Sequence, residues 1–255
     1  MSSASDGGRA QDMATARGDG PDLQLPAAVL WDMDGTLVDT EPYWIEAEHE
    51  LVGAHGGVWN DEFAHQLVGN ALEVSAQLII DQSGISLSVP EIVDALLQRV
   101  IRRVEQRVPW RPGARELLLE LGSLGVPSLL VTMSWRSLAD VVVRTLPDGA
   151  FDHLVTGDAV SHGKPHPEPY LAAARLVGTD PADCIAIEDS PAGVRSATAA
   201  GVPTIAIPHV VPVPHIEGAV HIDTLTGVRA ADLVDIVRPV RSEALQHVGD
   251  AASAD

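Results

Sequence analysis

The chain has 255 residues and a formal net charge of −20, and 45% of its residues are hydrophobic. This length and hydrophobic share fit a globular protein with one large core, or with a core and a smaller insert. The excess of acidic groups repels nucleic acid and anionic membranes, so we expect neither as a partner.

Cysteine usage and the distribution of apolar residues predict the cellular compartment. Cys184 is the only cysteine, so an internal disulfide cannot form, which fits a reducing cytoplasm. No apolar run approaches the ~20 residues that span a bilayer, and residues 1–24 lack the apolar centre of a signal peptide. We expect a cytoplasmic monomer or weak homodimer with a disordered tail at 1–24 and a flexible tail at 242–255.

Strand signals alternate with helix signals through much of the chain, which predicts an α/β fold with a Rossmann-like parallel sheet. The expected buried strands are 27–32, 128–132, 184–188 and 204–207, and the clearest core helices are 113–124 and 191–200. Both helices lead into a strand through Gly-Val-Pro, where Gly permits a left-handed turn and Pro blocks further helix. The predicted core comprises residues 25–39 and 110–241.

Residues 40–109 interrupt this alternation and predict an inserted helical cap domain. The segment has no convincing strand, and its clearest helix is expected at 90–108, where apolar residues recur at helical spacing. Ser88 and Glu91 stand in capping-box register at the start of that helix. Prolines at positions 42, 109 and 112 mark the expected joints near 39–42 and 108–112.

Polar side chains follow several of the predicted strands. Asp32 and Asp34 end the first strand on a tight turn, and Glu188 and Asp189 end another. The carboxyl ends of parallel strands meet at one sheet edge, where ligands bind in open α/β sheets. We therefore expect these four carboxylates to converge, together with Thr132 and Ser134 after a third strand and with Lys164 from a loop.

Charge balance predicts a metal ion at this edge. Two like charges ~4 Å apart repel each other by about 4 kcal/mol at an effective dielectric near 20. Lys164 is the only lysine in a chain with fifteen arginines, and one ammonium does not neutralise four carboxylates. A divalent cation with oxygen ligands, Mg²⁺ rather than Zn²⁺, would do so.

Four motifs together resemble the haloacid dehalogenase superfamily of phosphohydrolases. They occur in order within residues 27–210: Asp32-Met33-Asp34-Gly35-Thr36, then Thr132, then Lys164-Pro165 with Pro167 and Tyr170, then Glu188-Asp189-Ser190. The helical insert resembles the cap of the subgroup that includes sugar-phosphate phosphatases and β-phosphoglucomutase.

The resemblance implies a role for each motif residue. Asp32 would attack phosphorus as a nucleophile, and Asp34 would act as the general acid and base. Mg²⁺ would bind Asp32, the backbone oxygen of Asp34 and Asp189, with Glu188 as an indirect ligand. The phosphoryl oxygens would contact Thr132, Lys164 and backbone N–H groups near Met33 and Met133, with Ser134 close by.

Four further residues are weaker candidates. Tyr43 and Trp44, at the start of the first cap helix, would either line the substrate pocket or fill the core. Asn70, in a turn between cap helices, is a second candidate for the pocket wall. Arg136 would either reach the substrate or lie solvated in the first turn of a helix.

The sequence thus predicts an Mg²⁺-dependent phosphatase of a small phosphorylated metabolite, of the sugar or polyol phosphate type, that forms an aspartyl-phosphate. The alternative is phosphoryl transfer like that of β-phosphoglucomutase, but residues 67–73 of the cap offer no basic side chain for a second phosphate. A non-catalytic binding protein on the same fold would lack a motif residue, and none is missing.

Overall fold

The computed structural model describes residues 24–241. The predicted tail 242–255 lies outside the described residues, as does the tail 1–24 except for its last residue. None of the helices within residues 24–241 combines the length and the apolar character that a membrane crossing requires.

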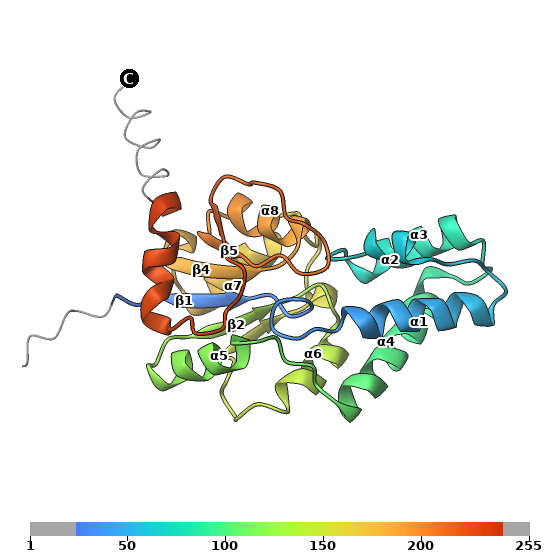
Figure 1. Ribbon diagram of the computed structural model, residues 1–255, viewed down its shortest axis with the longest axis horizontal. Coiled ribbons are helices and arrows are strands. Elements are labelled where there is room, and N and C mark those ends of the chain that lie inside the picture. The colour runs from blue at the N-terminus through green and yellow to red at the C-terminus, as the bar shows by residue number, and fades with distance from the viewer. Residues whose placement is uncertain (1–23, 242–255) are drawn as a thin grey trace, which may run out of the picture.

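Six parallel strands form a single sheet in the order β3-β2-β1-β4-β5-β6 (Figure 1). This confirms the predicted α/β, Rossmann-like fold. The strands are β1 (Ala28–Trp31), β2 (Ser128–Val131), β3 (His153–Val155), β4 (Cys184–Glu188), β5 (Thr204–Ala206) and β6 (Ala219–His221). The predicted strands correspond to β1, β2, β4 and β5, whereas β3 and β6 were not anticipated.

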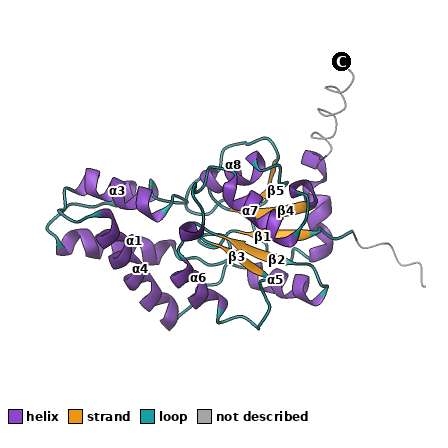
Figure 2. Ribbon diagram, turned by 180° about the vertical axis from the view of Figure 1, so that it is seen from behind, coloured by secondary structure: helices purple, strands orange, loops and turns teal. Residues whose placement is uncertain are grey.

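The central strands β1, β2 and β4 are fully buried because helices cover both faces of the sheet (Figure 2). The covering helices are α5 (Ala114–Ser123), α6 (Arg136–Val143), α7 (Glu168–Val177), α8 (Pro191–Ala199) and a helical segment over 233–241. Leu30 and Leu129 belong to one apolar cluster with residues of α7 and α8, while Trp31 and Leu130 belong to another with leucines of α5. Short 3₁₀ turns occur at Gly157–Ala159, Pro181–Asp183 and Ala230–Asp232.

The segment between β1 and α5 is helical, as predicted, and none of its residues from 41 to 108 lies in a strand. It contains α1 (Glu41–Ala54), α2 (Asp61–His65), α3 (Leu72–Ser83) and α4 (Val89–Gln106). The Glu91 carboxylate accepts hydrogen bonds from the backbone N–H and the hydroxyl of Ser88, at 2.8 and 2.6 Å. The expected acid therefore caps the N-terminus of α4.

The helices α1–α4 lie beyond the carboxyl end of β1 rather than on a face of the sheet (Figure 1). Their buried side chains, among them Leu51, Ile79 and Leu96, belong to the same apolar cluster as Trp31 and Leu130 of the sheet. The loop between α2 and α3 also reaches the core, because a Cβ on Gly69 would lie 2.7 Å from the Ser190 hydroxyl oxygen. The helical layer is therefore in contact with the strand ends that carry the polar motifs.

Candidate active site

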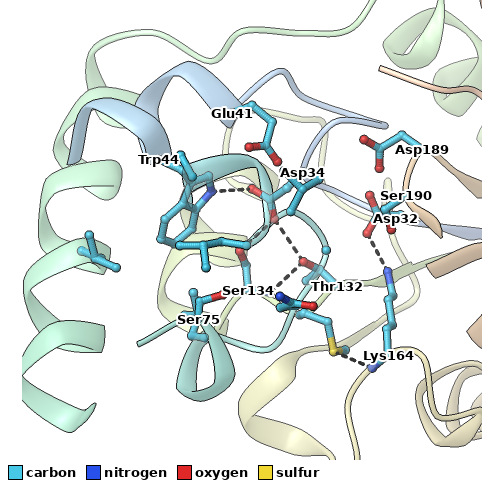
Figure 3. Close-up of a pocket in the computed structure, with 18 of the residues that line it drawn as sticks. Asp32, Asp34, Glu41, Trp44, Ser75, Thr132, Ser134, Lys164, Asp189 and Ser190 are labelled. Atoms are coloured by element: carbon cyan, nitrogen blue, oxygen red, sulfur yellow. Dashed lines mark hydrogen bonds and ion pairs between the residues drawn. The ribbon is translucent and has the colours of Figure 1, made fainter. Parts of the chain in front are cut away.

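The parallel sheet brings the predicted polar residues together at the carboxyl ends of its central strands (Figure 3). Asp32 follows β1, Thr132 follows β2, and Asp189 follows β4. These residues and Lys164, which comes from the loop before α7, line one pocket. Asp34, Met133, Ser134 and Asn70 also line it.

Lys164 is the central cation of the pocket. Its side chain is only 2% exposed, and its ammonium lies 2.6 Å from Asp32 Oδ1 and 2.6 Å from Glu188 Oε1. It also donates to the carbonyl oxygen of Val131 at 2.9 Å. An ammonium has three N–H donors, so all three are used, and they tie together the ends of β1, β2 and β4.

Glu188 is saturated with hydrogen bonds. Its Oε1 accepts from Lys164 and, at 2.6 Å, from the hydroxyl of Tyr170. Its Oε2 accepts from the hydroxyl of Ser190 at 3.3 Å and from the N–H of Asp189 at 3.2 Å. Within the described structure Glu188 therefore orients Lys164 rather than presenting a free oxygen.

Asp32 and Asp189 instead carry orphaned oxygens. The Oδ2 atoms of both residues are buried and accept no hydrogen bond from residues 24–241. One oxygen from each of Asp32, Asp189 and Glu188 lies within 4.8 Å of the others, although both Glu188 oxygens already accept hydrogen bonds. Buried carboxylate oxygens without donors are costly, and a set made only of oxygens suits Mg²⁺. The site therefore has a set of carboxylate oxygens that could hold a metal ion.

The turn after β1 leaves room for this arrangement. Gly35 has a φ of +88°, and a Cβ there would lie 2.0 Å from Asp189 Oδ2. The hydroxyl of Thr36 donates to Asp189 Oδ1 at 3.3 Å. Gly-Thr in the first motif thus permits the approach of Asp189 to Asp32 and fixes its carboxylate.

The pKa values reflect the crowding of negative charge. Burial raises the pKa of Asp32 to about 7, with a further contribution from the charge of Glu188, while Lys164 acts in the opposite direction. Burial and then the charges of Asp32 and Glu188 raise the pKa of Asp189 well above its usual value. One ammonium among three buried carboxylates leaves negative charge that a divalent cation would balance.

Asp34 is held by four donors from both sides of the pocket. Its Oδ1 accepts from the hydroxyl of Thr40 and, at 3.2 Å, from the indole N–H of Trp44. Its Oδ2 accepts from the hydroxyls of Ser134 at 2.8 Å and Thr132 at 3.3 Å. The orientation of this carboxylate therefore depends on both the core loops and α1.

Three candidates from the sequence lie away from the pocket wall. Tyr43 donates its hydroxyl to the backbone carbonyl of Arg107, and Trp44 occupies the wall instead. The Met33 side chain is fully buried in the core, so that only its backbone is near the site. Arg136 pairs with Asp140 at 2.6 Å on the outside of α6.

Sequence reasoning missed two acids of the pocket wall, Glu41 and Glu48. Both are buried, at 7% and 4% exposure, and they flank Trp44 on α1. Their spacing of seven residues, with Trp44 between them, places all three on one helical face. The sequence shows this helical spacing, but acidic residues on a helix face are usually exposed to solvent, so the pattern alone did not indicate a pocket.

A family model described as "Haloacid dehalogenase-like hydrolase" matches residues 29–207. This span contains β2 to β5 and all of β1 except Ala28, together with the helices α1–α8 and every motif residue described above. The chain therefore belongs to the haloacid dehalogenase-like hydrolases.

Two curated relatives show which reaction class the chain belongs to. The chain is 31% identical over 188 residues to hexitol phosphatase B of Escherichia coli, covering 71% of this chain and 83% of that protein. It is 35% identical over 183 residues to validoxylamine A 7'-phosphate phosphatase of Streptomyces hygroscopicus, covering 68% and 81%. With these phosphatase relatives, the chain is a phosphoric monoester hydrolase.

Solved structures agree with the fold. The CbbY protein of Rhodobacter sphaeroides, crystallised with xylulose-(1,5)bisphosphate, aligns with a TM-score of 0.71 and 26% identity, covering 80% of this chain and 96% of that one. The β-phosphoglucomutase of Clostridium difficile aligns with a TM-score of 0.72 over 87% and 99%, at 19% identity, which bears on the fold alone.

The buried position of Glu48 predicts a pH-dependent effect on stability. Burial raises the pKa of Glu48 to about 8 from 4.5, although the hydrogen bond from Trp59 opposes the shift. Between these pH values the folded state holds a proton that the unfolded chain has lost, so the free energy of unfolding falls as pH rises. Glu48→Gln should therefore stabilise the protein at pH 8, by on the order of 1 kcal/mol or more, and much less at pH 5.

Thermal unfolding of Glu48→Gln and wild type across this pH range checks the prediction. Glu73→Gln, an exposed acid of α3, is the matched control and should show no such trend. A difference between Glu48→Gln and wild type that stays constant with pH would contradict it.

Proposed function

We propose that the chain is an Mg²⁺-dependent phosphatase that hydrolyses a small phosphorylated metabolite, of the sugar or polyol phosphate type, through an aspartyl-phosphate on Asp32. The observation that carries the proposal is the juxtaposition of the buried Lys164 ammonium with Asp32 and with two orphaned carboxylate oxygens at one sheet edge. The phosphatase relatives support the substrate class.

In the first half-reaction, the Asp32 carboxylate forms a bond to phosphorus while the bond from phosphorus to the substrate oxygen breaks. Asp34, two residues further on, gives its proton to the leaving alcohol. Lys164 offsets the negative charge of Asp32 and of the phosphoryl group, and Thr132 with the backbone N–H groups near Met33, Met133 and Ser134 would contact the phosphoryl oxygens.

In the second half-reaction, Asp34 removes a proton from a water molecule, which attacks the phosphorus of the aspartyl-phosphate. Inorganic phosphate leaves and the Asp32 carboxylate is restored, so Asp34 is again protonated. Held by Asp32, Asp189 and the backbone oxygen of Asp34, with Glu188 acting indirectly, Mg²⁺ would neutralise charge on the transferring group.

The proposal assigns residues 40–109 to a cap and residues 25–39 with 110–241 to the catalytic core. The cap supplies Trp44 and Asn70 to the pocket wall, so selectivity for the alcohol part of the substrate would lie there. A monomer or weak homodimer in the cytoplasm remains part of the proposal, and the buried thiol of Cys184 is compatible with it.

A mutase would need a counter-charge for a second phosphate, and the pocket lacks one. Among the described residues that line the pocket, Lys164 is the only basic side chain. The nearby arginines of α4 are engaged elsewhere, because Arg99 and Arg103 pair with Glu46 and Glu50. We therefore propose that the chain hydrolyses its substrate rather than isomerising a sugar phosphate.

Asp32→Asn should lower the rate of phosphate release from p-nitrophenyl phosphate with Mg²⁺ by roughly 10³-fold or more, because an amide is a poor nucleophile of the same shape. Asp148→Asn, at an exposed acid, is the matched control and should retain the wild-type rate. Substantial turnover by correctly folded Asp32→Asn would remove Asp32 as the nucleophile.

Lys164→Arg should lose nearly as much activity as Lys164→Ala. Three acceptors surround a compact ammonium with a 2% exposed side chain, and a planar guanidinium does not fit that geometry. Steady-state kinetics of both variants, with circular dichroism as the folding check, measure this. Near-wild-type rates in Lys164→Arg would show that any cation suffices at this position.

A further inference from the structure

The helix α1 presents one unusual face to the pocket. Glu41, Trp44 and Glu48 all line the pocket, at 7%, 8% and 4% exposure. In Figure 3 the Glu41 carboxylate and the Trp44 indole lie on the side of the pocket opposite Lys164. The α1 side of the pocket is therefore acidic and aromatic.

The Glu41 carboxylate points into the pocket without a partner. No hydrogen bond or ion pair joins it to any group within residues 24–241, although the side chain is more than nine-tenths buried. An acid at the first turn of a helix is favoured by the helix dipole, but that effect operates equally well from the solvent side. The position of the carboxylate inside the pocket therefore calls for another explanation.

Glu48 is buried about two turns further along α1. It accepts one hydrogen bond, from the indole N–H of Trp59 to Oε2 at 3.1 Å. No described cation contacts it. The acids on the outer face of the same helix differ, because Glu46 and Glu50 both pair with Arg103 of α4. Counter-charges thus exist for the exposed acids of α1 and not for the buried ones.

We propose that Glu41, Trp44 and Glu48 form a subsite for an ammonium group on the alcohol part of the substrate. Carboxylates and an aromatic face together recognise such a cation. A bound ammonium would favour loss of the proton that the buried Glu48 carboxyl otherwise holds. The inference rests on the proposed phosphatase function and narrows its substrate to a phosphomonoester of an amino alcohol or amino sugar. Leu67, Leu72 and Leu96 complete the wall and would contact the carbon skeleton.

Two matched substrate pairs test the subsite: 2-aminoethyl phosphate against 2-hydroxyethyl phosphate, and glucosamine 6-phosphate against glucose 6-phosphate. With Mg²⁺, the wild type should give at least a tenfold higher kcat/KM for the amine in one pair or both, chiefly through a lower KM. N-Acetylglucosamine 6-phosphate, which has lost the positive charge, should fall to the level of glucose 6-phosphate or below.

The variants Glu41→Gln and Glu48→Gln should each reduce the amine-to-hydroxyl ratio of kcat/KM by fivefold or more. Glu73→Gln, the exposed control on α3, should keep the wild-type ratio. A merely structural role of the two acids would lower both substrates of a pair alike and leave the ratio unchanged. If a variant fails to fold, the test uses the wild type alone. The kcat/KM values for glucosamine 6-phosphate, glucose 6-phosphate and N-acetylglucosamine 6-phosphate then decide whether the subsite binds an ammonium group.

One outcome is that the enzyme cleaves p-nitrophenyl phosphate with Mg²⁺ and still gives an amine-to-hydroxyl ratio of kcat/KM near one in both pairs. That result would overturn the ammonium subsite and leave the proposed phosphatase function unaffected. A preference for the hydroxyl substrates would indicate that the two acids bind polyol hydroxyls instead, and would also overturn it. No cleavage of any phosphomonoester, p-nitrophenyl phosphate included, would contradict the proposed function itself.

Discussion

The structure depends on one buried ion cluster, the ammonium of Lys164 among the carboxylates at the sheet edge. Lys164 contacts the ends of β1, β2 and β4 at once, through Asp32, the carbonyl of Val131 and Glu188. Burying these charges is costly unless they are paired and hydrogen-bonded. The bonds from Tyr170 and Ser190 to Glu188 supply that satisfaction, so the loops after three strands are fixed relative to each other.

In the same cluster, two carboxylate oxygens have no hydrogen-bond donor among the described residues. Glu188 has no free oxygen, whereas Asp32 and Asp189 each keep a buried oxygen that no described group satisfies. Stability alone does not explain these oxygens, because apolar residues of similar volume often stabilise a core as well as a buried ion pair does or better. In the proposed mechanism these oxygens would bind the cation and, at Asp32, attack the phosphoryl group.

The pocket has two chemically different ends. The sheet edge carries Lys164 and the hydroxyls of Thr132 and Ser134, whereas α1 carries Glu41, Trp44 and Glu48. Asp34 lies between them, bound to groups of both ends, where a proton donor to the leaving alcohol is needed. A phosphomonoester placed along this axis would have its phosphate at the core and its alcohol under the helices.

The sequence predicts the core well because each central strand is a buried apolar run that ends in polar residues. Buried apolar runs precede Asp32, Thr132 and Glu188, and a parallel sheet leaves only one edge where these ends can meet. The strands β3 and β6 were missed because both lie at the edges of the sheet and are partly exposed, so neither forms a continuous buried apolar run. The equally short β5 is fully buried and was predicted.

The cap side of the site was harder to predict because tertiary packing decides which helix face is buried. Tyr43 and Trp44 are neighbours with similar propensities, yet only Trp44 reaches the pocket. Glu41 and Glu48 resemble the solvated acids Glu46 and Glu50 in sequence, and only the position of α4 and its arginines separates the two pairs. No pattern within α1 alone carries that information.

Trapping the covalent intermediate tests the central claim most directly. The enzyme is quenched in acid during turnover of p-nitrophenyl phosphate with Mg²⁺, digested, and examined by peptide mass spectrometry. The account predicts a phosphoryl group on the peptide that contains Asp32, fragmenting to Asp32 itself and decaying when the substrate is exhausted. A phosphoryl group on another residue, or steady turnover with none on Asp32 under conditions that preserve acyl phosphates, would contradict it.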